Sequence, residues 1–380
     1  MEGDLININE WLRPLSWLYG AGVWVRNFLF DSKVLKETAF PAPVICVGNI
    51  TVGGTGKTPH TEMLLRMLGD LFPTRPLAVL SRGYKRSSRG FVMAAADTSM
   101  RQIGDEPWQM KQKFPGAIIA VDANRRHGIN EILRNVKATD SADSPIIILD
   151  DAYQHRYVKA GLNILLTDYH RLITDDSLLP AGRLREQVSG KDRAHIVIVS
   201  KCPEKMTPIE FRVVRKSLHL KPFQRLFFSQ LHYGALRPLF TKVEERTVVG
   251  AKSSTHEVVT KSEEITSETH VILLTGIASP EQMMMDIQKR TRHIIPLFFA
   301  DHHEFTSSDV EKIERIFTSL QGSKRLIVTT EKDAARLQLV KDKLSTMVCR
   351  HVYVLPVEVR FMCDEEPEFR QMVASFINGQ

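Results

Sequence analysis

The sequence predicts an α/β fold: a mainly parallel sheet domain, a second and smaller α/β domain, and an N-terminal amphipathic helix. Short apolar runs rich in β-branched residues alternate with stretches of helical periodicity along most of the 380 residues. This alternation is typical of parallel strands joined by helices. One run passes through a glycine-rich turn into a helical stretch, "VGNITVGGTGKTP" at 47–59. The chain length favours two domains.

The composition is that of a globular protein, with 43% hydrophobic and 25% charged residues. A formal net charge of +7 indicates an anionic partner, which could be a nucleotide, a nucleic acid or an acidic membrane surface. The four cysteines show neither metal-ligand spacing nor a disulfide framework, so we expect free thiols in a reducing compartment. The opening "MEGDLININE" is acidic and no signal-peptide pattern follows, so a cytoplasmic location is expected.

Residues 1–30 are expected to form a membrane-interface segment. The stretch 8–30 holds three of the four tryptophans, and Arg13 and Arg26 interrupt its apolar run. A spanning helix needs about 20 consecutive apolar residues, so spanning is not expected. Tryptophan prefers the lipid–water boundary, where arginine meets lipid phosphate. A helix lying on the membrane surface is therefore favoured, although an amphipathic helix packed on the protein explains this stretch equally well.

The first α/β domain is expected over 31–230. Its first expected strand is a short apolar run that ends near a glycine, and a helix is expected over 58–71 after it. The runs that predict strands are 42–50, 75–84, 116–128, 144–155, 162–168 and 194–201.

The second domain is expected over 231–380. Before its strands comes a polar stretch, 241–270, which predicts a protruding hairpin or a flexible insert. The alternation of strands and helices then resumes. The runs that predict its elements are 270–282, 293–317, 325–337 and, as a last strand, 352–361.

The turn at 51–58 approximates the phosphate-binding pattern G-x-x-x-x-G-K-[ST], with Thr51 in place of the first glycine. A buried strand before it and a helix after it favour a true phosphate loop over an ordinary turn with a surface lysine. Lys57 would reach the β- and γ-phosphates, and Thr58 would bind Mg²⁺. The residues expected to hold the nucleotide phosphates are Gly53, Gly54, Thr55, Gly56, Lys57 and Thr58.

Carboxylates at two places are candidates for the chemistry. Asp150 and Asp151 end an apolar run, where ligands bind in open α/β sheets, and predict Mg²⁺ ligands; a helix N-cap explains one of them but not both. Asp105, in "GDEP", would either cap a helix or accept a proton from an acceptor hydroxyl. The residues alone favour the cap.

The sequence alone leaves the roles of three basic or titratable residues undecided. Arg125 and Arg183 would neutralise phosphate charge or lie on a solvated surface. His302 follows an expected strand and, taken alone, is most simply structural.

The stretch 200–203, "SKCP", lacks the aspartate with which GTP-specific phosphate-loop proteins recognise guanine, so ATP is favoured.

Several motifs occur together in a recognisable order: "VGNITVGGTGKTP", "SRGYKR", "GDEP", "LDDAYQH", "LLPAGRLRE", "TGIASP", "FADHHEF" and "TTEKDA". As a set, from residue 47 to about 335, they resemble the tetraacyldisaccharide 4'-kinase family of lipid A biosynthesis. Thr51 fits this family, whose loop is similar. Ala152 and Tyr153 depart from its usual Gly-Phe without touching the carboxylates.

The resemblance implies an ATP-dependent, Mg²⁺-requiring kinase that phosphorylates the 4'-hydroxyl of a tetraacyldisaccharide 1-phosphate. It implies a peripheral protein at the cytoplasmic face of the bacterial inner membrane, with 8–30 as its docking segment. It also implies two α/β domains joined by a hinge that close around ATP. No nucleic-acid partner is expected.

The resemblance also assigns residue roles. Asp105 matches the catalytic carboxylate, and His302 matches its partner from the other domain, which would orient Asp105 and tune its basicity. Lys57 keeps its catalytic contact with the phosphates. The matching metal ligands and charge-neutralising residues are Thr58, Asp150, Asp151, Arg125 and Arg183.

Two other functions fit parts of the sequence. A soluble phosphate-loop kinase for a small metabolite would not need residues 1–30 for membrane association. A nucleotide-switched chaperone or binding protein would hydrolyse ATP without a phosphoryl acceptor. Transfer of label from ATP into a lipid would separate the lipid kinase from both.

Overall fold

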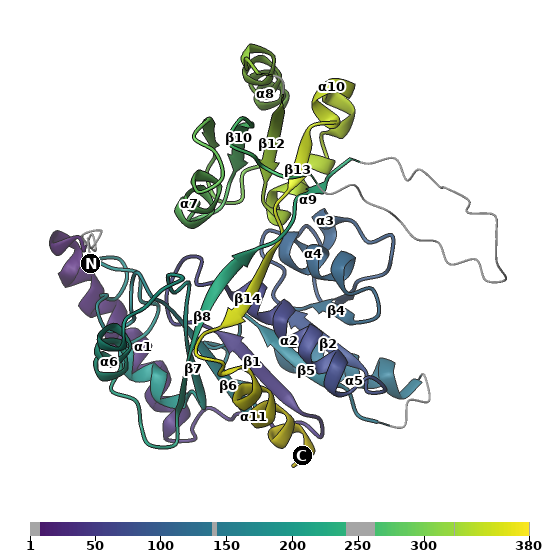
Figure 1. The fold of residues 1–380 in the computed structure, drawn as a ribbon. Coiled ribbons are helices and arrows are strands. Elements are labelled where there is room, and N and C mark those ends of the chain that lie inside the picture. Colours follow the sequence, from purple (N-terminus) through teal and green to yellow (C-terminus); the bar gives the residue numbers. More distant parts are fainter. Residues whose placement is uncertain (1–7, 139–142, 241–262, 323, 380) are drawn as a thin grey trace. The chain divides into compact units, whose positions relative to one another are not determined.

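The computed structural model describes residues 8–138, 143–240, 263–322 and 324–379. The chain forms two compact units, each described here by itself. The first comprises Met1–His232 with Val359–Gln380, and the second comprises Tyr233–Glu358. Each is built on one sheet with helices (Figure 1). The α/β class expected from the alternating pattern is confirmed.

The first unit contains a nine-stranded sheet in the order β14-β8-β7-β6-β1-β5-β2-β4-β3. Strand β1 lies near the middle, parallel to β5 on one side and β6 on the other, and the short β3 is antiparallel to β4. The strands are β1 (Val44–Gly48), β2 (Leu77–Ser81), β3 (Val92–Met93), β4 (Ile118–Val121), β5 (Ile146–Asp150), β6 (Leu162–Asp168), β7 (Ile196–Ser200), β8 (Arg225–Tyr233) and β14 (Val357–Phe361).

Helices accompany these strands in the first unit (Figure 1). The phosphate-loop helix, α2, follows β1 directly, as its periodicity predicts. The helical elements are η1 (Glu10–Leu12), α1 (Arg13–Asp31), α2 (Lys57–Leu71), α3 (Met100–Ile103), α4 (Asp105–Lys113), α5 (Arg125–Ala138), η2 (Val188–Arg193), α6 (Pro208–Ser217) and α11 (Glu366–Asn378).

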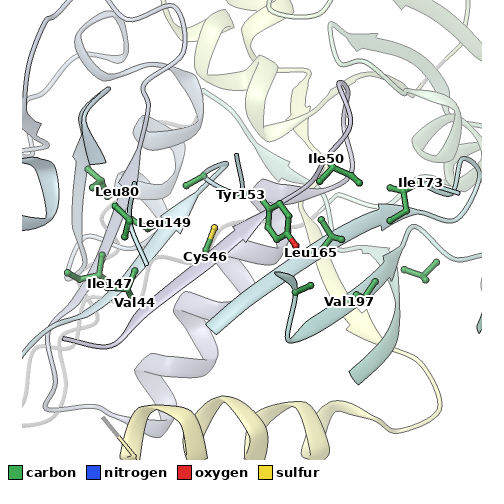
Figure 2. Packing of buried hydrophobic residues seen from close by; sticks show 14 of the residues in the cluster. Val44, Cys46, Ile50, Leu80, Ile147, Leu149, Tyr153, Leu165, Ile173 and Val197 are labelled. Atoms are coloured by element: carbon green, nitrogen blue, oxygen red, sulfur yellow. The ribbon is translucent and has the colours of Figure 1, made fainter. Parts of the chain in front are cut away.

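The central strands of the first unit, such as β1, β5 and β7, are buried on both faces, which explains their nearly continuous apolar sequences. Alternate residues of these strands belong to two separate core clusters. Figure 2 shows the first, in which Cys46, Leu149 and Leu165 of neighbouring strands pack beside Tyr153. The opposite cluster holds Ile45. This two-sided core fixes the sheet edge from which the candidate site loops emerge.

The second unit contains a five-stranded sheet in the order β11-β10-β12-β13-β9, parallel except for β9. Its strands are β9 (Arg237–Pro238), β10 (His270–Thr275), β11 (Ile294–Phe298), β12 (Arg325–Thr329) and β13 (Val352–Val354). Its helical elements are α7 (Glu281–Gln288), α8 (Ser307–Ser319), α9 (Glu331–Gln338), η3 (Lys341–Lys343) and α10 (Thr346–Cys349).

The expected last strand, 352–361, is two strands in two different sheets. β13 belongs to the second unit, and β14 lies beside β8 in the sheet of the first. Pro356, which has no N–H to donate to a ladder, lies between them. The prediction of one strand was therefore wrong.

The second unit ends at Glu358, whereas the sequence placed its domain boundary at residue 380. Helix α11 buries Phe369, Val373 and Ile377 in a core cluster of the first unit. The chain thus leaves the first unit in β8 and returns in β14, its neighbour in the sheet. Of the predicted polar insert at 241–270, residues 241–262 lie outside the described residues.

Helix α1 packs on the first unit through three buried residues, Ser16, Gly20 and Phe30. Pro14 lies in its first turn, where a missing N–H costs nothing. The Ser16 hydroxyl donates to the Leu178 carbonyl at 3.0 Å. At Gly20 a Cβ would come within 2.8 Å of Leu178 Cδ1, so glycine permits this close approach. The contacts expected of a helix packed on the protein are therefore present.

Much of the remaining surface of this segment consists of exposed apolar side chains. Trp11 is 93% exposed and Trp17 is 73% exposed, while Trp24 stacks on Phe28 with ring centroids 5.5 Å apart. We call the exposed apolar side chains of this segment the outward arc; they are Trp11, Leu15, Trp17, Leu18, Trp24, Val25 and Phe28. No helix among the described residues has the length and apolar character needed to cross a membrane.

Candidate functional site

The phosphate loop connects β1 to α2 and needs glycine at two positions. Gly53 has φ +115° and Gly56 has φ +78°, both in the left-handed region that favours glycine. Thr51 lies instead in a short antiparallel bridge with Leu184. The Val52 N–H donates to the Arg183 carbonyl at 2.7 Å. The unusual Thr51 therefore occupies an extended position, where no glycine is required.

The buried side chain of Asn49 holds the loop from within. Its amide donates to the hydroxyls of Thr51 at 3.2 Å and Thr55 at 2.9 Å. Its Oδ1 accepts from Lys57 Nζ at 3.4 Å. Asn49 was missed by sequence reasoning, although an asparagine between a buried strand and a glycine-rich turn was a usable signal.

Two further side chains hold consecutive carbonyls of the loop. The Ser200 hydroxyl donates to the Thr55 carbonyl at 2.9 Å. The Nδ1 atom of His60 lies 2.7 Å from the Gly56 carbonyl, and its Nε2 lies 2.9 Å from Ser229 Oγ. Burial lowers the pKa of His60 to about 4, so its ring is neutral at neutral pH.

The His60 tautomer follows from these partners. A carbonyl can only accept, so Nδ1 carries the proton and donates to Gly56. The Ser229 hydroxyl, on β8, therefore donates to Nε2. We call the chain Ser229–His60–Gly56 the histidine brace. It ties the phosphate loop to the strand through which the chain leaves the first unit.

The paired carboxylates lie beside the loop lysine. Asp150 is buried and accepts from the Thr61 hydroxyl at 3.0 Å. Burial, and after it the charges of Asp151 and Glu106, raises the pKa of Asp150 to about 6. Asp151 Oδ1 lies 3.4 Å from Lys57 Nζ and 3.6 Å from a nitrogen of Arg185. The structure thus brings Lys57, Asp150 and Asp151 together and adds Arg185, from the same "LLPAGRLRE" motif as Arg183.

The donor set beside Lys57 fits a hard divalent cation. Asp151 Oδ1 is buried and has no hydrogen-bond partner among the described residues. Within the described ranges no group of three or more His, Cys, Asp or Glu side chains could hold a metal by itself. Mg²⁺ usually takes only one or two carboxylates and completes its shell with water and phosphate oxygens. Two aspartates beside a phosphate loop match that requirement.

The two predicted phosphate-neutralising arginines both belong to the first unit. Arg125 begins α5 and is buried, and its Nη1 donates to the Asp122 carbonyl at 2.9 Å. The guanidinium of Arg183 lies against the phosphate loop, where a Cβ on Gly53 would be 4.0 Å from its Nη1. Arg183 is therefore at the loop, and Arg125 follows strand β4 of the same sheet.

Asp105 is the first residue of α4, and the N-cap position belongs to Gly104. The N-cap interpretation, which the residues alone favoured, was therefore wrong. Gly104 has φ +93°, and a Cβ there would lie 2.9 Å from the Tyr84 carbonyl. The "GDEP" and "SRGYKR" motifs consequently meet at this point of the first unit.

His302 belongs to the second unit and has φ +59°. Its Nε2 lies 3.1 Å from Lys332 Nζ, and its Nδ1 lies 3.2 Å from Arg336 Nη2. Asp333 is fully buried and accepts from the Gly276 N–H at 2.9 Å and from Arg336 at 3.0 Å. The "TTEKDA" motif, which had no predicted role, thus supplies Lys332 beside His302, and its Asp333 pairs with Arg336, the second cation there.

Comparisons with known proteins agree on one family. A family model described as "Tetraacyldisaccharide-1-P 4'-kinase" matches residues 8–378. A Phocaeicola vulgatus protein named tetraacyldisaccharide 4'-kinase is 51% identical over 377 residues, covering 99% of this chain and 97% of that protein. A Bacteroides thetaiotaomicron protein of the same name is 46% identical, covering 99% and 95%.

A solved structure shares the fold. It is the crystal structure of LpxK from Aquifex aeolicus in complex with ATP, with a TM-score of 0.67 and 25% sequence identity. The match covers 97% of this chain and 99% of that one. Sequence and structure comparisons therefore both extend over nearly the whole chain.

Proposed function

The chain belongs to the tetraacyldisaccharide-1-P 4'-kinase family, and on that premise we propose that it transfers the γ-phosphate of ATP to the 4'-hydroxyl of a tetraacyldisaccharide 1-phosphate. The main structural support is the braced phosphate loop with Lys57 beside Asp150 and Asp151. In the reaction the acceptor oxygen bonds to the γ-phosphorus, the bond to the β,γ-bridging oxygen breaks, and ADP leaves. Such transfers depend mostly on positioning and charge neutralisation.

The loop residues have the roles that phosphate binding requires. The N–H groups of Gly53 to Thr58 surround the triphosphate at the start of α2, where the helix dipole favours an anion. Lys57 exchanges its long contact with Asp151 for the β- and γ-phosphates. Arg125 and Arg183 add positive charge as negative charge shifts toward the leaving oxygen.

Thr58, Asp150 and Asp151 would hold Mg²⁺, which when bound supplies charge neutralisation of the phosphates. The raised pKa of Asp150 reflects the cost of burying a carboxylate beside another one. A cation at this place would relieve that cost, which supports the assignment of both aspartates to the metal.

Asp105 is proposed as the group that accepts the proton of the 4'-hydroxyl. It lies in the first turn of α4. His302, from the second unit, is proposed to orient this carboxylate and tune its basicity. These two roles come from the family resemblance of the "GDEP" and "DHH" motifs.

We also propose that the outward arc of α1 rests on the cytoplasmic leaflet of the bacterial inner membrane. Three tryptophans, two leucines, a valine and a phenylalanine face away from the unit on which α1 packs. Aromatic residues prefer the headgroup boundary, and the positive net charge favours an anionic surface. This placement presents the enzyme to a lipid acceptor.

The experiment that tests the function is label transfer. The purified full chain is incubated with γ-labelled ATP, Mg²⁺ and the purified disaccharide lipid 1-phosphate in mixed micelles. We expect label in the lipid phase, at the 4'-position, and none with Lys57→Ala. Label only in free phosphate would support a nucleotide-switched protein instead. Label in a small soluble metabolite, supplied as a cell extract, would support the soluble kinase.

A further inference from the structure

One buried carboxylate of the first unit has no part in the roles proposed above. Glu62 lies on α2, five residues after Lys57, and only 2% of its surface is exposed. Leu64 and Leu65, its buried neighbours on the same helix, are apolar. A carboxylate removed from water is costly unless it is paired and hydrogen-bonded. The partners of Glu62 therefore indicate what this residue does.

Both oxygens of Glu62 contact the same neighbouring helix, α4 (Figure 1). Its Oε1 accepts from the side-chain amide of Gln109 at 2.7 Å. Its Oε2 accepts from Lys113 Nζ at 2.6 Å, which makes a buried ion pair with a partly exposed lysine. We call Glu62, Gln109 and Lys113 the carboxylate clamp. It joins the phosphate-loop helix to α4 at two points.

The clamp holds the face of α4 that begins with Asp105. In an α-helix, residues four apart lie one above the other on the same face. Asp105, Gln109 and Lys113 follow one another at intervals of four, and Asp105 and Lys113 are the first and last residues of the helix. At a rise of about 1.5 Å per residue, the two ends are about 12 Å apart. Contacts at two heights along one face fix both the rotation of α4 about its axis and its tilt relative to α2.

Apolar packing alone leaves α4 less precisely oriented. Pro107 and Met110 are the buried residues of this short helix, and apolar burial is not directional. A buried ion pair adds little net stability over apolar side chains of the same volume, whereas its hydrogen bonds have a defined direction. The carboxylate clamp is therefore better suited to fixing the orientation of α4 than to adding stability.

The start of α2 also contacts the groups proposed to bind the nucleotide and its metal. Thr61, next to Glu62, donates to Asp150 at 3.0 Å. Lys57, the first residue of the helix, lies 3.4 Å from Asp151. The first two turns of α2 are thus a common reference for the phosphate loop, for both aspartates and, through the clamp, for the helix that begins with Asp105.

We propose that Glu62 is a positioning residue that acts through Asp105: by holding Gln109 and Lys113, it sets where the proposed base lies relative to the phosphate loop. The proposal rests on the proposed function, in which Asp105 accepts the proton of the acceptor hydroxyl. A general base must lie within hydrogen-bond reach of that proton. A displacement of about 1 Å can lower the rate about a hundredfold. The Lys113 charge has little direct effect on Asp105, because it is screened over the length of the helix.

A double-mutant cycle between Glu62 and Asp105 tests the proposal. The purified full chain is assayed for label transfer from γ-labelled ATP to the disaccharide lipid 1-phosphate in mixed micelles. The variants are Glu62→Leu, Asp105→Ala and the combination of the two. The matched control is Lys111→Met, which removes a lysine from the same helix, where its Nζ donates to the Pro115 and Ala117 carbonyls.

We expect Glu62→Leu to lower kcat by about tenfold to a hundredfold, with the KM for ATP within about twofold of wild type. In the Asp105→Ala background the same change should lower kcat by less than about twofold, because the group that Glu62 positions is absent. Glu62→Gln, which keeps one oxygen and one amide group for the clamp, should recover part of the loss. Lys111→Met should match wild type.

A further variant, Glu62→Leu combined with Lys113→Met, separates positioning from stability. It replaces the charges of the clamp by apolar side chains, a change that often preserves stability. Its unfolding temperature should stay near that of wild type, while its kcat stays as low as that of Glu62→Leu alone. Recovery of kcat in this variant would overturn the proposal, because directional contacts would then be unnecessary.

An equal fall of kcat in both backgrounds would also overturn the proposal, because Glu62 would then not act through Asp105. A rise of the KM for ATP with an unchanged kcat would do the same, since the effect would then lie at the phosphate loop. Each of these results leaves the kinase function intact, because wild type still transfers label. Absence of label transfer by wild type would instead contradict the proposed function.

Discussion

Asp105 illustrates a residue whose proposed role depends on the position that the fold gives it. It follows the left-handed Gly104 and begins a helix without capping it. Asp105→Ala should lower kcat by at least about two orders of magnitude, a typical contribution of a general base. Steady-state kinetics measures this, with Glu131→Ala on α5, where Glu131 pairs with the exposed Arg134, as a control. An unchanged kcat with weakened ATP binding would contradict the assignment.

The histidine brace makes a prediction about the phosphate loop. His60→Leu removes the donor to the Gly56 carbonyl and the acceptor for Ser229, so the loop backbone loses a fixed contact. We expect KM for ATP to rise about fivefold to tenfold, the value of one hydrogen bond, with a smaller change in kcat. His60→Gln, which can still donate, should recover part of the affinity.

Equilibrium binding of ATP checks the same point, and thermal unfolding provides the control. A purely structural role would lower the unfolding temperature of His60→Leu while leaving its ATP affinity unchanged. That outcome would count against the brace as a positioning device.

The buried environment of His195 makes the free energy of unfolding depend on pH. Burial lowers the pKa of His195 below its ordinary value of 6.5, and its Nδ1 accepts the Asn163 N–H at 3.0 Å. As pH falls through 6.5, the unfolded chain binds a proton at this residue while the folded protein does not. The free energy of unfolding therefore decreases on acidification. Urea unfolding at several pH values should show a shallower decrease for His195→Gln, and an identical slope would contradict this.

At the residue scale, the sequence revealed those site residues that belong to a short recognisable sequence pattern. The pattern around Lys57 and the two aspartates at a strand end predicted which residues the structure groups together. His60 and Ser200 were missed because their contacts are made with chain segments distant in sequence. Asn49 was missed although its side-chain partners Thr51, Thr55 and Lys57 lie close to it in the sequence. A histidine in an amphipathic helix does not reveal that a serine more than a hundred residues later faces its ring.

Among the elements, α1 shows how small residues decide which face of a helix packs. The periodicity predicted an amphipathic helix but not its orientation, because apolar residues occur nearly all around it. Ser16 and Gly20 allow the backbone to approach Leu178 closely, so the large side chains turn outward. This arrangement, with Ser16, Gly20 and Phe30 buried and the tryptophans exposed, could not be predicted from hydrophobicity alone.

The outward arc predicts membrane association that depends on particular side chains. Trp17→Glu places a charge at the centre of the arc and should weaken binding to vesicles containing anionic lipid by at least about tenfold. Vesicle co-sedimentation of the full chain measures the change. The control is Ile209→Glu on α6, another exposed apolar residue at 71% exposure, which should bind like wild type. Equal binding by both variants would contradict a role for the arc.

Strands were well predicted where they are buried on both sides and less well where the chain changes sheets. The run 352–361 reads as one β-rich stretch, yet its two halves pair with different partners around Pro356. Pairing partners are a long-range property, so apolar composition could not reveal the change. The nine-residue β8 and the short β3 and β9 were not predicted.

On the scale of the whole molecule, the first unit is assembled from both ends of the chain. Phe369 of α11 is fully buried and packs edge-on against Phe227 of β8, with ring centroids 5.4 Å apart. Phe369→Ala should lower the free energy of unfolding of the first unit by about 3–5 kcal/mol. Phe223→Ala, at a position 58% exposed, is the control and should change it little.

Chemical unfolding monitored by ATP binding shows in which unit the stability is lost. In Phe369→Ala we expect ATP binding to be lost at a lower denaturant concentration than in wild type. If that transition stayed in place, the last helix would not support the nucleotide-binding unit.

The sequence predicted two α/β units and their approximate border near residue 230. It did not predict that the second unit is inserted into the first. Local patterns mark where a strand or helix lies, whereas the return of α11 depends on which core its apolar face fits. That choice is made by packing between distant parts of the chain.

This insertion has a consequence during synthesis on the ribosome. The central sheet around the ATP loop emerges early, yet its α11-covered side lacks residues 359–380 until the whole inserted unit has been made. The inserted unit, by contrast, has all its strands as soon as residue 358 has left the exit tunnel. A nascent chain therefore holds an uncovered apolar sheet while the inserted unit is made, and a chain that stops before α11 has an incomplete catalytic unit.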